Sequence, residues 1–281
     1  MDALALKQML LQLPSVNLSA YGLEQPYDLA LHMMHHIGSP DPVLRDELIY
    51  FTMAEWIGQH VFSDEQLKAL LLLAMDEEHL FYRIGEQGTD SVFTRAFSVL
   101  MLPPILGVDR QRPFLHRDEI HWIKERLITY LRGEMDVRGY VENKGWAHAP
   151  AHAADAVEDL AKSPYLARTD LLELLHALSI KVMESNQVYI YDEDQRMAQA
   201  AMTILGRNLL EQAELEDWVK LLQDARSEDE DEGRTLQQFS QLSLNIRMFM
   251  QSLYFVIRDQ KAEPFPLACS LLLRALNGRD D

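Results

Sequence analysis

Residues 42–57, with the sequence PVLRDELIYFTMAEWI, carry the pattern that decides the fold class. Within this segment Leu44, Leu48 and Phe51 recur at intervals of three and four, and so fall on one side of a helix. The same spacing continues along most of the chain, whereas strand-like composition is confined to QVYIY at 187–191. That stretch is too short and too solitary to build a sheet. The sequence therefore predicts an all-α protein.

Start and stop signals on either side of this segment divide the chain into helices. Ser63 followed by Gln66 fits a capping box, in which two side chains satisfy free backbone N–H groups at a helix start. The charge run SEDEDEG at 227–233 predicts a solvated loop before a C-terminal helical cap. We expect helices at roughly 2–12, 26–37, 43–59, 64–75, 91–106, 117–133, 147–162, 168–184, 193–206, 209–225, 235–259 and 265–277.

The order of these helices indicates repeats. Polar-edged helices are expected to begin near residues 44, 91, 148 and 193, each followed by a longer partner, at spacings of 47, 57 and 45 residues. Helix pairs that recur at about 40–47 residues are typical of HEAT or armadillo repeats. We therefore expect one α-solenoid domain over 1–281, with an N-terminal helical cap (1–40), repeats (41–226), and an acidic loop with C-terminal helices (227–281). The alternative is an irregular helical bundle with accidental spacing.

Composition excludes several classes of function. The net charge is −18, from 44 acidic and 26 basic residues, and the chain has no run of Lys or Arg. Such a field repels phosphate backbones, which argues against nucleic-acid binding. The first residues, MDALALKQMLLQLPS, lack the features of a signal peptide, and no apolar stretch is long enough to span a bilayer. The single cysteine, Cys269, cannot form an internal disulfide. We therefore expect a cytoplasmic protein that binds neither nucleic acid nor membrane.

Three of the expected helices carry a narrow polar stripe on a largely apolar surface. In each, polar residues are spaced i, i+4 and i+7, which places them along one side of the helix. A helix that is apolar around most of its girth packs on several sides, so we expect its polar stripe to face a groove. The stripes are Ser91, Arg95 and Ser98; His148, His152 and Asp155; and Asp192, Arg196 and Gln199.

The densest group of polar residues extends from Asp136 to Asp155. His148 and His152, one helical turn apart, could both reach one metal ion, with Asp155 as a third ligand. HAPAH nevertheless lacks the glutamate of the HExxH motif, so we prefer a hydrogen-bonded groove without a metal or other cofactor. Pro150 restricts this segment to the first turn of a helix and leaves His148 near the cap.

Two smaller groups have structural interpretations. His32, His35 and His36 precede Gly38 and are interpreted as a solvated helix end. Arg45 and its neighbour Asp46 could form a structural ion pair between repeats or contribute to a site.

These motifs resemble the bacterial domain-of-unknown-function family 2785. The resemblance covers most of residues 40–225 and rests on four stretches, PVLRDELIYFTMAEWI (42–57), GEQGTDSVFTRAFSVLML (85–102), RGYVENKGWAHAPAHAADAVEDLA (138–161) and DEDQRMAQA (192–200). It implies a site at the motif's residues and no particular activity, and Pro150 departs from the family's usual pattern. The motif residues are Asp90, Ser91, Arg95, Lys144, Gly145, Trp146, His148, His152 and Asp155.

The leading functional hypothesis is a curved helical scaffold that binds a small polar or anionic ligand, or a peptide segment, in its groove. Arg and Lys side chains would meet anionic groups, Trp146 would stack, and the histidines would orient the ligand. One alternative is a hydrolase that uses His148 or His152 as general base, with or without a metal. Another is a protein–protein interaction scaffold whose stripes seal repeat to repeat. The expected ligand-binding residues are Asp90, Ser91, Arg95, Arg138, Lys144, Trp146, His148, His152, Asp155 and Arg196.

Overall fold

The computed structural model describes residues 1–12, 26–184, 186–227 and 233–277. Helices form nearly all of its regular structure, and within these residues the strands are confined to one short hairpin. This confirms the predicted all-α class. The acidic loop predicted at 227–233 lies almost wholly outside the described residues. The chain divides into two compact units, unit 1 (Met1–His116 and Gly133–His152) and unit 2 (Arg117–Arg132 and Ala153–Asp281).

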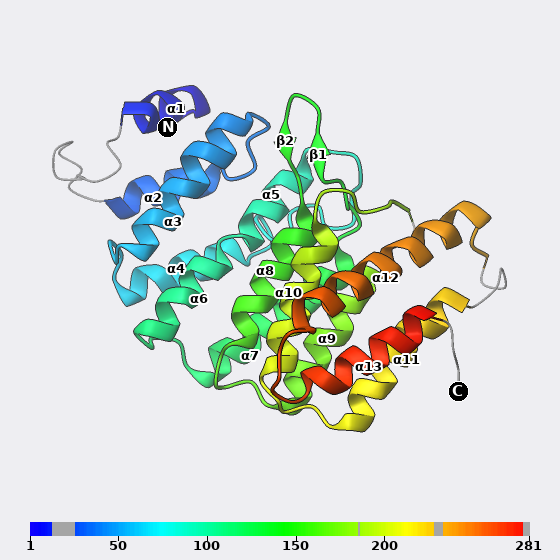
Figure 1. The fold of residues 1–281 in the computed structure, drawn as a ribbon. Coiled ribbons are helices and arrows are strands. Elements are labelled where there is room, and N and C mark those ends of the chain that lie inside the picture. The colour runs from blue at the N-terminus through cyan, green and yellow to red at the C-terminus, as the bar shows by residue number, and fades with distance from the viewer. Residues whose placement is uncertain (13–25, 185, 228–232, 278–281) are drawn as a thin grey trace. The chain divides into compact units, whose positions relative to one another are not determined.

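Unit 1 is built from short helices (Figure 1), and their buried side chains form an aliphatic and aromatic core. Helix α1 packs on η2, α2 packs on α4, and α6 packs on both α3 and α4. These contacts bury apolar side chains such as Ile49, Met53 and Leu67 completely. The elements are α1 (Ala3–Gln12), α2 (Pro26–His35), η2 (Val43–Tyr50), α3 (Phe51–Gly58), α4 (Asp64–Ala74), α5 (Ser91–Val99), α6 (Leu102–Gln111), β1 (Tyr140–Val141) and β2 (Gly145–Trp146).

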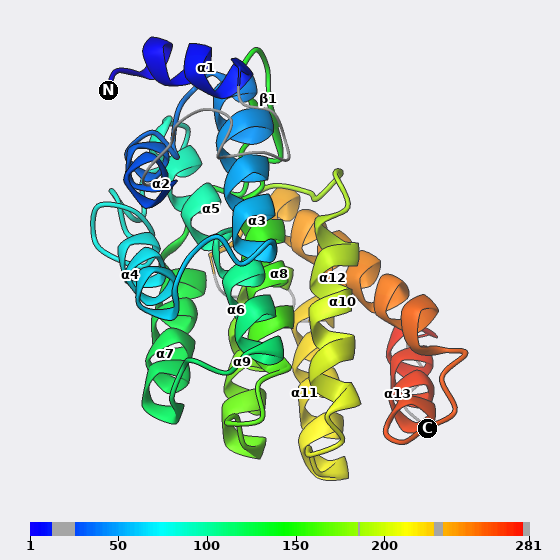
Figure 2. The same cartoon turned by 90° about the vertical axis from the view of Figure 1, so that its left-hand side faces the viewer.

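Unit 2 is built from longer helices, and α12 crosses α10 obliquely (Figure 2). Helix α12 also packs on α9, α11 and α13. At the centre, the Nε1 of Trp218 donates a 2.8 Å hydrogen bond to the Ser179 hydroxyl, and its ring meets Phe249 edge-on. The elements are α7 (Arg117–Gly133), α8 (Ala149–Ala161, which begins in unit 1), α9 (Arg168–Val182), α10 (Glu193–Gly206), α11 (Gln212–Ser227), α12 (Leu236–Ile257) and α13 (Phe265–Asn277).

The expected start of α4 is confirmed in atomic detail. The Ser63 hydroxyl accepts a hydrogen bond from the Gln66 backbone N–H, and the Gln66 side chain accepts one from the Ser63 N–H. The prediction of one continuous helix at 91–106 is wrong. The chain turns at Leu100 and Met101, which divides the segment into α5 and α6. Two prolines follow in the first turn of α6, where a missing backbone N–H breaks no helical hydrogen bond.

One apolar segment also differs from the sequence-based expectation. Among the described residues Ser91–Gln111 is long and apolar enough, by length and composition, to cross a membrane. The turn between α5 and α6 does not interrupt the apolar composition, so the two helices together reach this length. Because 78% of the apolar window is buried inside the protein, the segment has the burial of a core helix.

Two local features bear on the site. Val43–Tyr50, predicted as part of an α-helix, is a π-helix, a form that often accompanies functional sites. The hairpin at 140–146 was not predicted, because each of its strands has only two residues and shows no measurable alternation. The strand-like stretch at 187–191 forms no strand.

Candidate functional site

The candidate site is built around the hairpin of unit 1. Its strands run antiparallel, with Tyr140 directly opposite Trp146. Asn143 and Gly145 have positive φ angles of 61° and 78°, which tight turns require and which asparagine and glycine adopt most readily. A Cβ added to Gly145 would lie 2.8 Å from Cβ of Pro42. Glycine at this position therefore allows the hairpin to lie directly against the start of η2.

Arg45 of η2 binds the backbone of the hairpin through its guanidinium group. Its side chain is completely buried. Nη2 donates to the carbonyl oxygens of Lys144 at 2.6 Å and Trp146 at 3.3 Å, and Nη1 donates to that of Ser39 at 2.6 Å. Nε lies 2.7 Å from Oδ1 of Asp46, so the ion pair that the sequence suggested is confirmed within unit 1.

Burial governs the electrostatics of this ion pair. The Arg45 guanidinium lies over the rings of Phe93 and Phe97, 4.1 and 4.8 Å from their centroids. Burial lowers the pKa of Arg45, against the attraction of Asp46. Burial likewise raises the pKa of Asp46, although Arg45 and a backbone hydrogen bond from Trp146 oppose this shift. Arg45 therefore fixes the hairpin through its bonds to the carbonyl groups, and removing Arg45 and Asp46 from water costs free energy.

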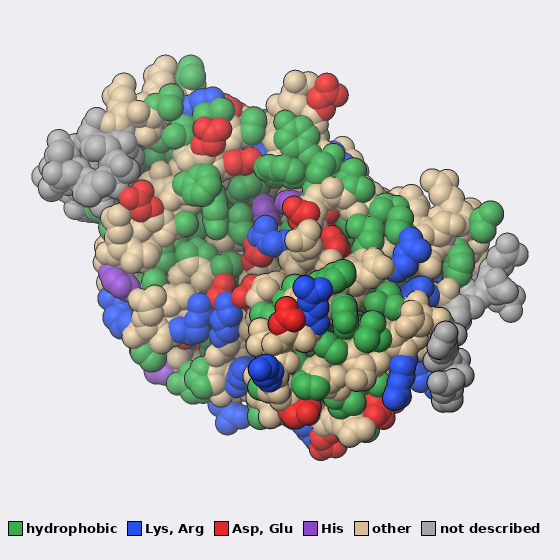
Figure 3. Space-filling model, in the orientation of Figure 1, with side chains coloured by type: hydrophobic (Ala, Val, Ile, Leu, Met, Phe, Trp, Pro, Cys, Tyr) green, Lys and Arg blue, Asp and Glu red, His purple; other side chains and the backbone are tan. Residues whose placement is uncertain are grey.

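A continuous series of ring contacts leads from the hairpin to α5, and we call its exposed part, the side chains of Tyr140 and Trp146, the front of the hairpin. Tyr140 meets Trp146 edge-on, with centroids 5.2 Å apart, and Trp146 stacks on His148 at 4.8 Å. His148 contacts His152 at 5.8 Å, and His152 meets Phe97 edge-on at 5.2 Å. Tyr140 and Trp146 remain 50% and 39% exposed. Figure 3 shows hydrophobic side chains gathered over the hairpin, with an acidic side chain at its tip.

His148 occupies a conformation that few residues other than glycine adopt. Its φ is 55°, and its N–H donates a 2.9 Å hydrogen bond to the Arg138 carbonyl oxygen. Residues in this left-handed region are held there by their surroundings and are enriched at functional sites. Helix α8 begins at Ala149, so Pro150 lies in its first turn and His148 immediately precedes it, as predicted.

An exposed ion pair lies beside the hairpin. The Lys144 Nζ donates to both carboxylate oxygens of Asp90, at 2.7 and 2.8 Å. The two side chains are 41% and 46% exposed. Solvent screens such a pair, so exchange of one partner for a ligand group costs little. Lys144 and Asp90 are therefore brought together at the surface, where a ligand can reach them.

Arg95, in contrast, is completely buried and holds a loop in place. Its guanidinium binds Glu134 through two hydrogen bonds of 2.6 and 2.8 Å, both to a carboxylate that is also buried. It further donates to the carbonyl oxygens of Tyr82, Arg83 and Glu86, at 3.1–3.2 Å. The five donors of an arginine suit this task, because residues 82–90 form turns but no helix or strand, and several of their carbonyl groups need a donor.

Ser91 completes this network at the start of α5. Its hydroxyl accepts a 2.8 Å hydrogen bond from Arg95 and donates to the Glu86 carboxylate at 2.9 Å. The hydrogen bond from Ser91, with a second from Thr89, lowers the pKa of Glu86. Ser91 is 6% exposed, so it reaches the loop rather than the surface.

Asp136 and Arg138 connect the same loop to the segment before the hairpin. The buried Asp136 carboxylate accepts hydrogen bonds from the Gly88 N–H at 2.9 Å and from the Arg138 guanidinium at 2.7 Å. Arg138 also donates to the Thr89 carbonyl oxygen at 2.6 Å. Its side chain is 27% exposed, so it lies at the edge of the candidate site.

The remaining predicted residues divide between the units. In unit 2, the Arg196 guanidinium donates two hydrogen bonds to the Asp155 carboxylate. In unit 1, Nδ1 of His152 lies 3.1 Å from the Ala96 carbonyl oxygen. Within the described residues, no group of three or more His, Cys, Asp or Glu side chains is placed to hold a metal ion. The geometry therefore gives no support to the sequence-based alternative of a metal on His148, His152 and Asp155.

Sequence reasoning missed two residues of this region. Glu134 was not singled out, although its position one residue past the end of α7 and two before Asp136 makes an acidic pair that could have been noted. Tyr140 was missed because the hairpin was missed. The turn sequence from Glu142 to Gly145 was the available signal, since asparagine and glycine between short apolar segments favour hairpins.

Fold and site together define an all-α protein with an aromatic hairpin held by the buried Arg45 and a neighbouring loop held by the buried Arg95. The model of a family described as "Protein of unknown function (DUF2785)" matches residues 80–255 of the 281. The chain belongs to this family, which confirms the resemblance drawn from the motifs. No curated protein and no solved structure matches the chain.

Proposed function

We propose that unit 1 binds a small polar or anionic ligand, or a peptide segment with such groups, on the front of the hairpin. The observation that carries the proposal is the exposed cross-strand pair of Tyr140 and Trp146 beside the Lys144–Asp90 ion pair. Aromatic side chains that remain exposed on a fixed backbone supply large contact area at a low cost in conformational entropy.

The exposed ammonium group of Lys144 can pair with an anionic group of a ligand, which most of the surrounding acidic surface cannot do. The chain carries a net charge of −18, so an anion is repelled from most of its surface. A ligand carboxylate that replaces Asp90 at the ammonium keeps the number of ion pairs constant. The planar part of the same ligand would then contact Trp146, which is already supported on one face by His148. The ligand class is therefore an anion attached to an apolar or planar group.

The buried arginines make this surface rigid before a ligand arrives. Arg45 fixes the carbonyl groups of Lys144 and Trp146, and Arg95 fixes the loop that leads to Asp90. Binding to a preorganised surface avoids the entropic cost of ordering a loop. In this proposal Arg95, Ser91 and Asp136 position the site, and Lys144, Trp146, Tyr140 and Asp90 contact the ligand.

A ligand screen by thermal shift tests the proposal, because a ligand of the folded state raises the melting temperature by mass action. We expect the hits to include carboxylates with an apolar or planar part, and we expect Trp146→Ala and Lys144→Ala to abolish their shifts. Trp122→Ala is the matched control, since Trp122 is 38% exposed against 39% for Trp146. Hits that survive Trp146→Ala, or that are lost equally in Trp122→Ala, would contradict the proposal.

A hydrolase is the second candidate, favoured by the hydrogen bond of His152. The Ala96 carbonyl oxygen can only accept, so Nδ1 of the neutral His152 ring carries the proton and Nε2 carries the lone pair of a general base. An ester and amide substrate panel tests this role. Activity that is lost in His152→Gln and follows the titration of one group would support it, and no turnover above buffer would refute it.

The HEAT- or armadillo-like solenoid remains part of the proposal. It is supported by the starts of the first helices of the expected pairs, Val43, Ser91, Ala149 and Glu193, which lie within one residue of the expected positions. Small-angle X-ray scattering from the full chain tests it. A scattering curve that fits only a compact bundle would contradict the solenoid.

A further inference from the structure

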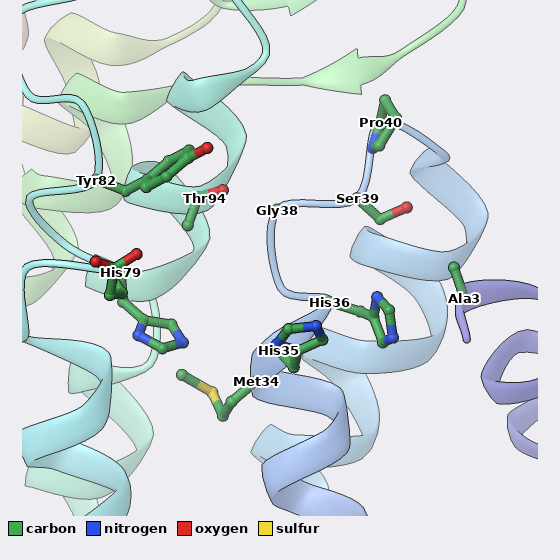
Figure 4. Close-up of a pocket in the computed structure, with 11 residues that line it drawn as sticks. Ala3, Met34, His35, His36, Gly38, Ser39, Pro40, His79, Tyr82 and Thr94 are labelled. Carbon is green, nitrogen blue, oxygen red and sulfur yellow. The ribbon is translucent and has the colours of Figure 1, made fainter. Parts of the chain in front are cut away.

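We propose that a pocket in unit 1, separate from the front of the hairpin, binds a small aliphatic amine. The pocket has a volume of about 430 Å³, within the range of about 300–1,000 Å³ typical of ligand sites. His35, His36 and Ser39 line it from the end of α2 and the turn that follows, and His79 and Tyr82 line it from the segment after α4. In Figure 4 the His79 ring projects into the pocket toward His35.

Hydrogen bonds to two of the imidazoles make the pocket rich in acceptors. Nδ1 of His79 lies 2.8 Å from a carboxylate oxygen of Asp76, and Nε2 of His36 lies 3.0 Å from the Met1 carbonyl oxygen. Both partners can only accept, so these two nitrogens carry the protons. In each neutral ring the second nitrogen is then an acceptor. Glu78, which also lines the pocket, adds a carboxylate that can only accept.

The charge of the lining selects a cation. Neither lysine nor arginine is among the described residues that line the pocket, and Glu78 is the permanently charged side chain among them. The pocket adjoins both the C-terminal end of α2 and the N-terminal end of α1, whose opposite dipoles offset each other, so the Glu78 carboxylate decides the sign of the charge. An anion would face the Glu78 carboxylate, whereas an ammonium group finds both a negative charge and acceptors in the lining.

The rest of the lining suits the carbon chain of such a ligand. Met34, Pro40 and Ala3 contribute apolar surface beside the polar groups (Figure 4). An ammonium group offers three N–H donors, which matches an arrangement of imidazole nitrogens, hydroxyls and one carboxylate. A short aliphatic amine therefore satisfies the polar groups and covers the apolar ones at the same time.

Isothermal titration calorimetry on the full chain, at about pH 8, tests this assignment with three four-carbon probes. Putrescine carries ammonium groups, 1,4-butanediol carries hydroxyls at the same positions, and succinate carries carboxylates. We expect putrescine to bind at a single site and the other two probes to give no measurable heat of binding. Equal binding of butanediol, or no binding of putrescine, would overturn the proposal.

Two neighbouring substitutions separate a specific site from general attraction to an acidic protein. Glu78→Gln removes one charge from an exposed position of the lining, where solvent screens the ion pair, and should weaken putrescine binding by about twofold to fivefold. Glu77→Gln makes the same change of charge at an exposed residue outside the lining and should leave the affinity unchanged. An equal loss in both variants, or no loss in Glu78→Gln, would show diffuse attraction and refute the pocket. Trp146→Ala should leave putrescine binding unaffected, and a loss there would assign the amine to the hairpin instead.

Discussion

Replacing Arg95 with methionine tests whether this residue supports the site or contacts the ligand. The substitution keeps a long apolar side chain but leaves the Glu134 carboxylate, 2% exposed, without its guanidinium partner. Removing one member of a buried ion pair typically costs about 3–5 kcal/mol. The loop carbonyl groups that also lose a donor, at Tyr82, Arg83 and Glu86, lie near solvent and can be rehydrated, so they add little to this cost. We expect Arg95→Met to lower the free energy of unfolding of unit 1 by about 3–5 kcal/mol.

Urea unfolding followed by circular dichroism measures this loss, with the transition midpoint compared between variants. Arg83→Met is the matched control, because the Arg83 side chain is 60% exposed, and it should change stability by less than about 0.5 kcal/mol. The double variant Arg95→Met/Glu134→Leu should recover part of the loss, since it removes the stranded charge. Recovery should be incomplete because Glu134 also accepts the Asp136 N–H. If Arg95→Met unfolds like the wild-type protein, the guanidinium does not anchor the loop and the ligand-binding role predicted from the sequence regains its basis.

Three further predictions follow from local geometry. Ser63→Ala removes the cap of α4 and should cost about 1 kcal/mol in urea unfolding, and a change near zero would contradict the cap. Gly145→Ala places a Cβ 2.8 Å from Pro42 at a φ of 78° and should destabilise by about 1–3 kcal/mol, while lowering affinity for ligands of the hairpin. The Lys7 hydrogen bond lowers the pKa of Asp41 below its usual 3.8. The pair should therefore stabilise the fold, by less than about 1 kcal/mol, above pH 4 and lose this contribution as pH falls through the lowered pKa. Asp41→Asn, measured from pH 6 to 2, should abolish that part of the pH dependence.

The helices were predictable because their causes are local. Apolar spacing and capping residues act over a few positions, so α4 and its Ser63 cap could be placed from sequence. The division between α5 and α6 depends on Leu100 and Met101, whose composition differs little from that of their neighbours, and was missed. The hairpin was missed for a related reason, since a two-residue strand shows no periodicity.

The site was only partly predictable, because its pairings are not local. The residue types and positions around Lys144 and Trp146 were found, and the family motif pointed to the same stretch. The roles could not be assigned, since Arg95 meets Glu134, 39 residues away, and no spacing rule connects two such positions. A guanidinium on an apolar helix has the same sequence pattern whether it faces a ligand or a buried carboxylate.

The two buried arginines of unit 1 have a common task that explains why such costly groups are retained. Each desolvated guanidinium is paired with one carboxylate, Arg45 with Asp46 and Arg95 with Glu134, and each directs its other donors at backbone carbonyl groups of an irregular segment. Apolar replacements would be cheaper to bury, but they would remove the links that the two guanidinium groups make from η2 and α5 to the hairpin and the loop. The helices of unit 1 thus hold a short hairpin and an irregular loop in place, and Trp146 and Lys144 lie on a backbone that Arg45 links to η2.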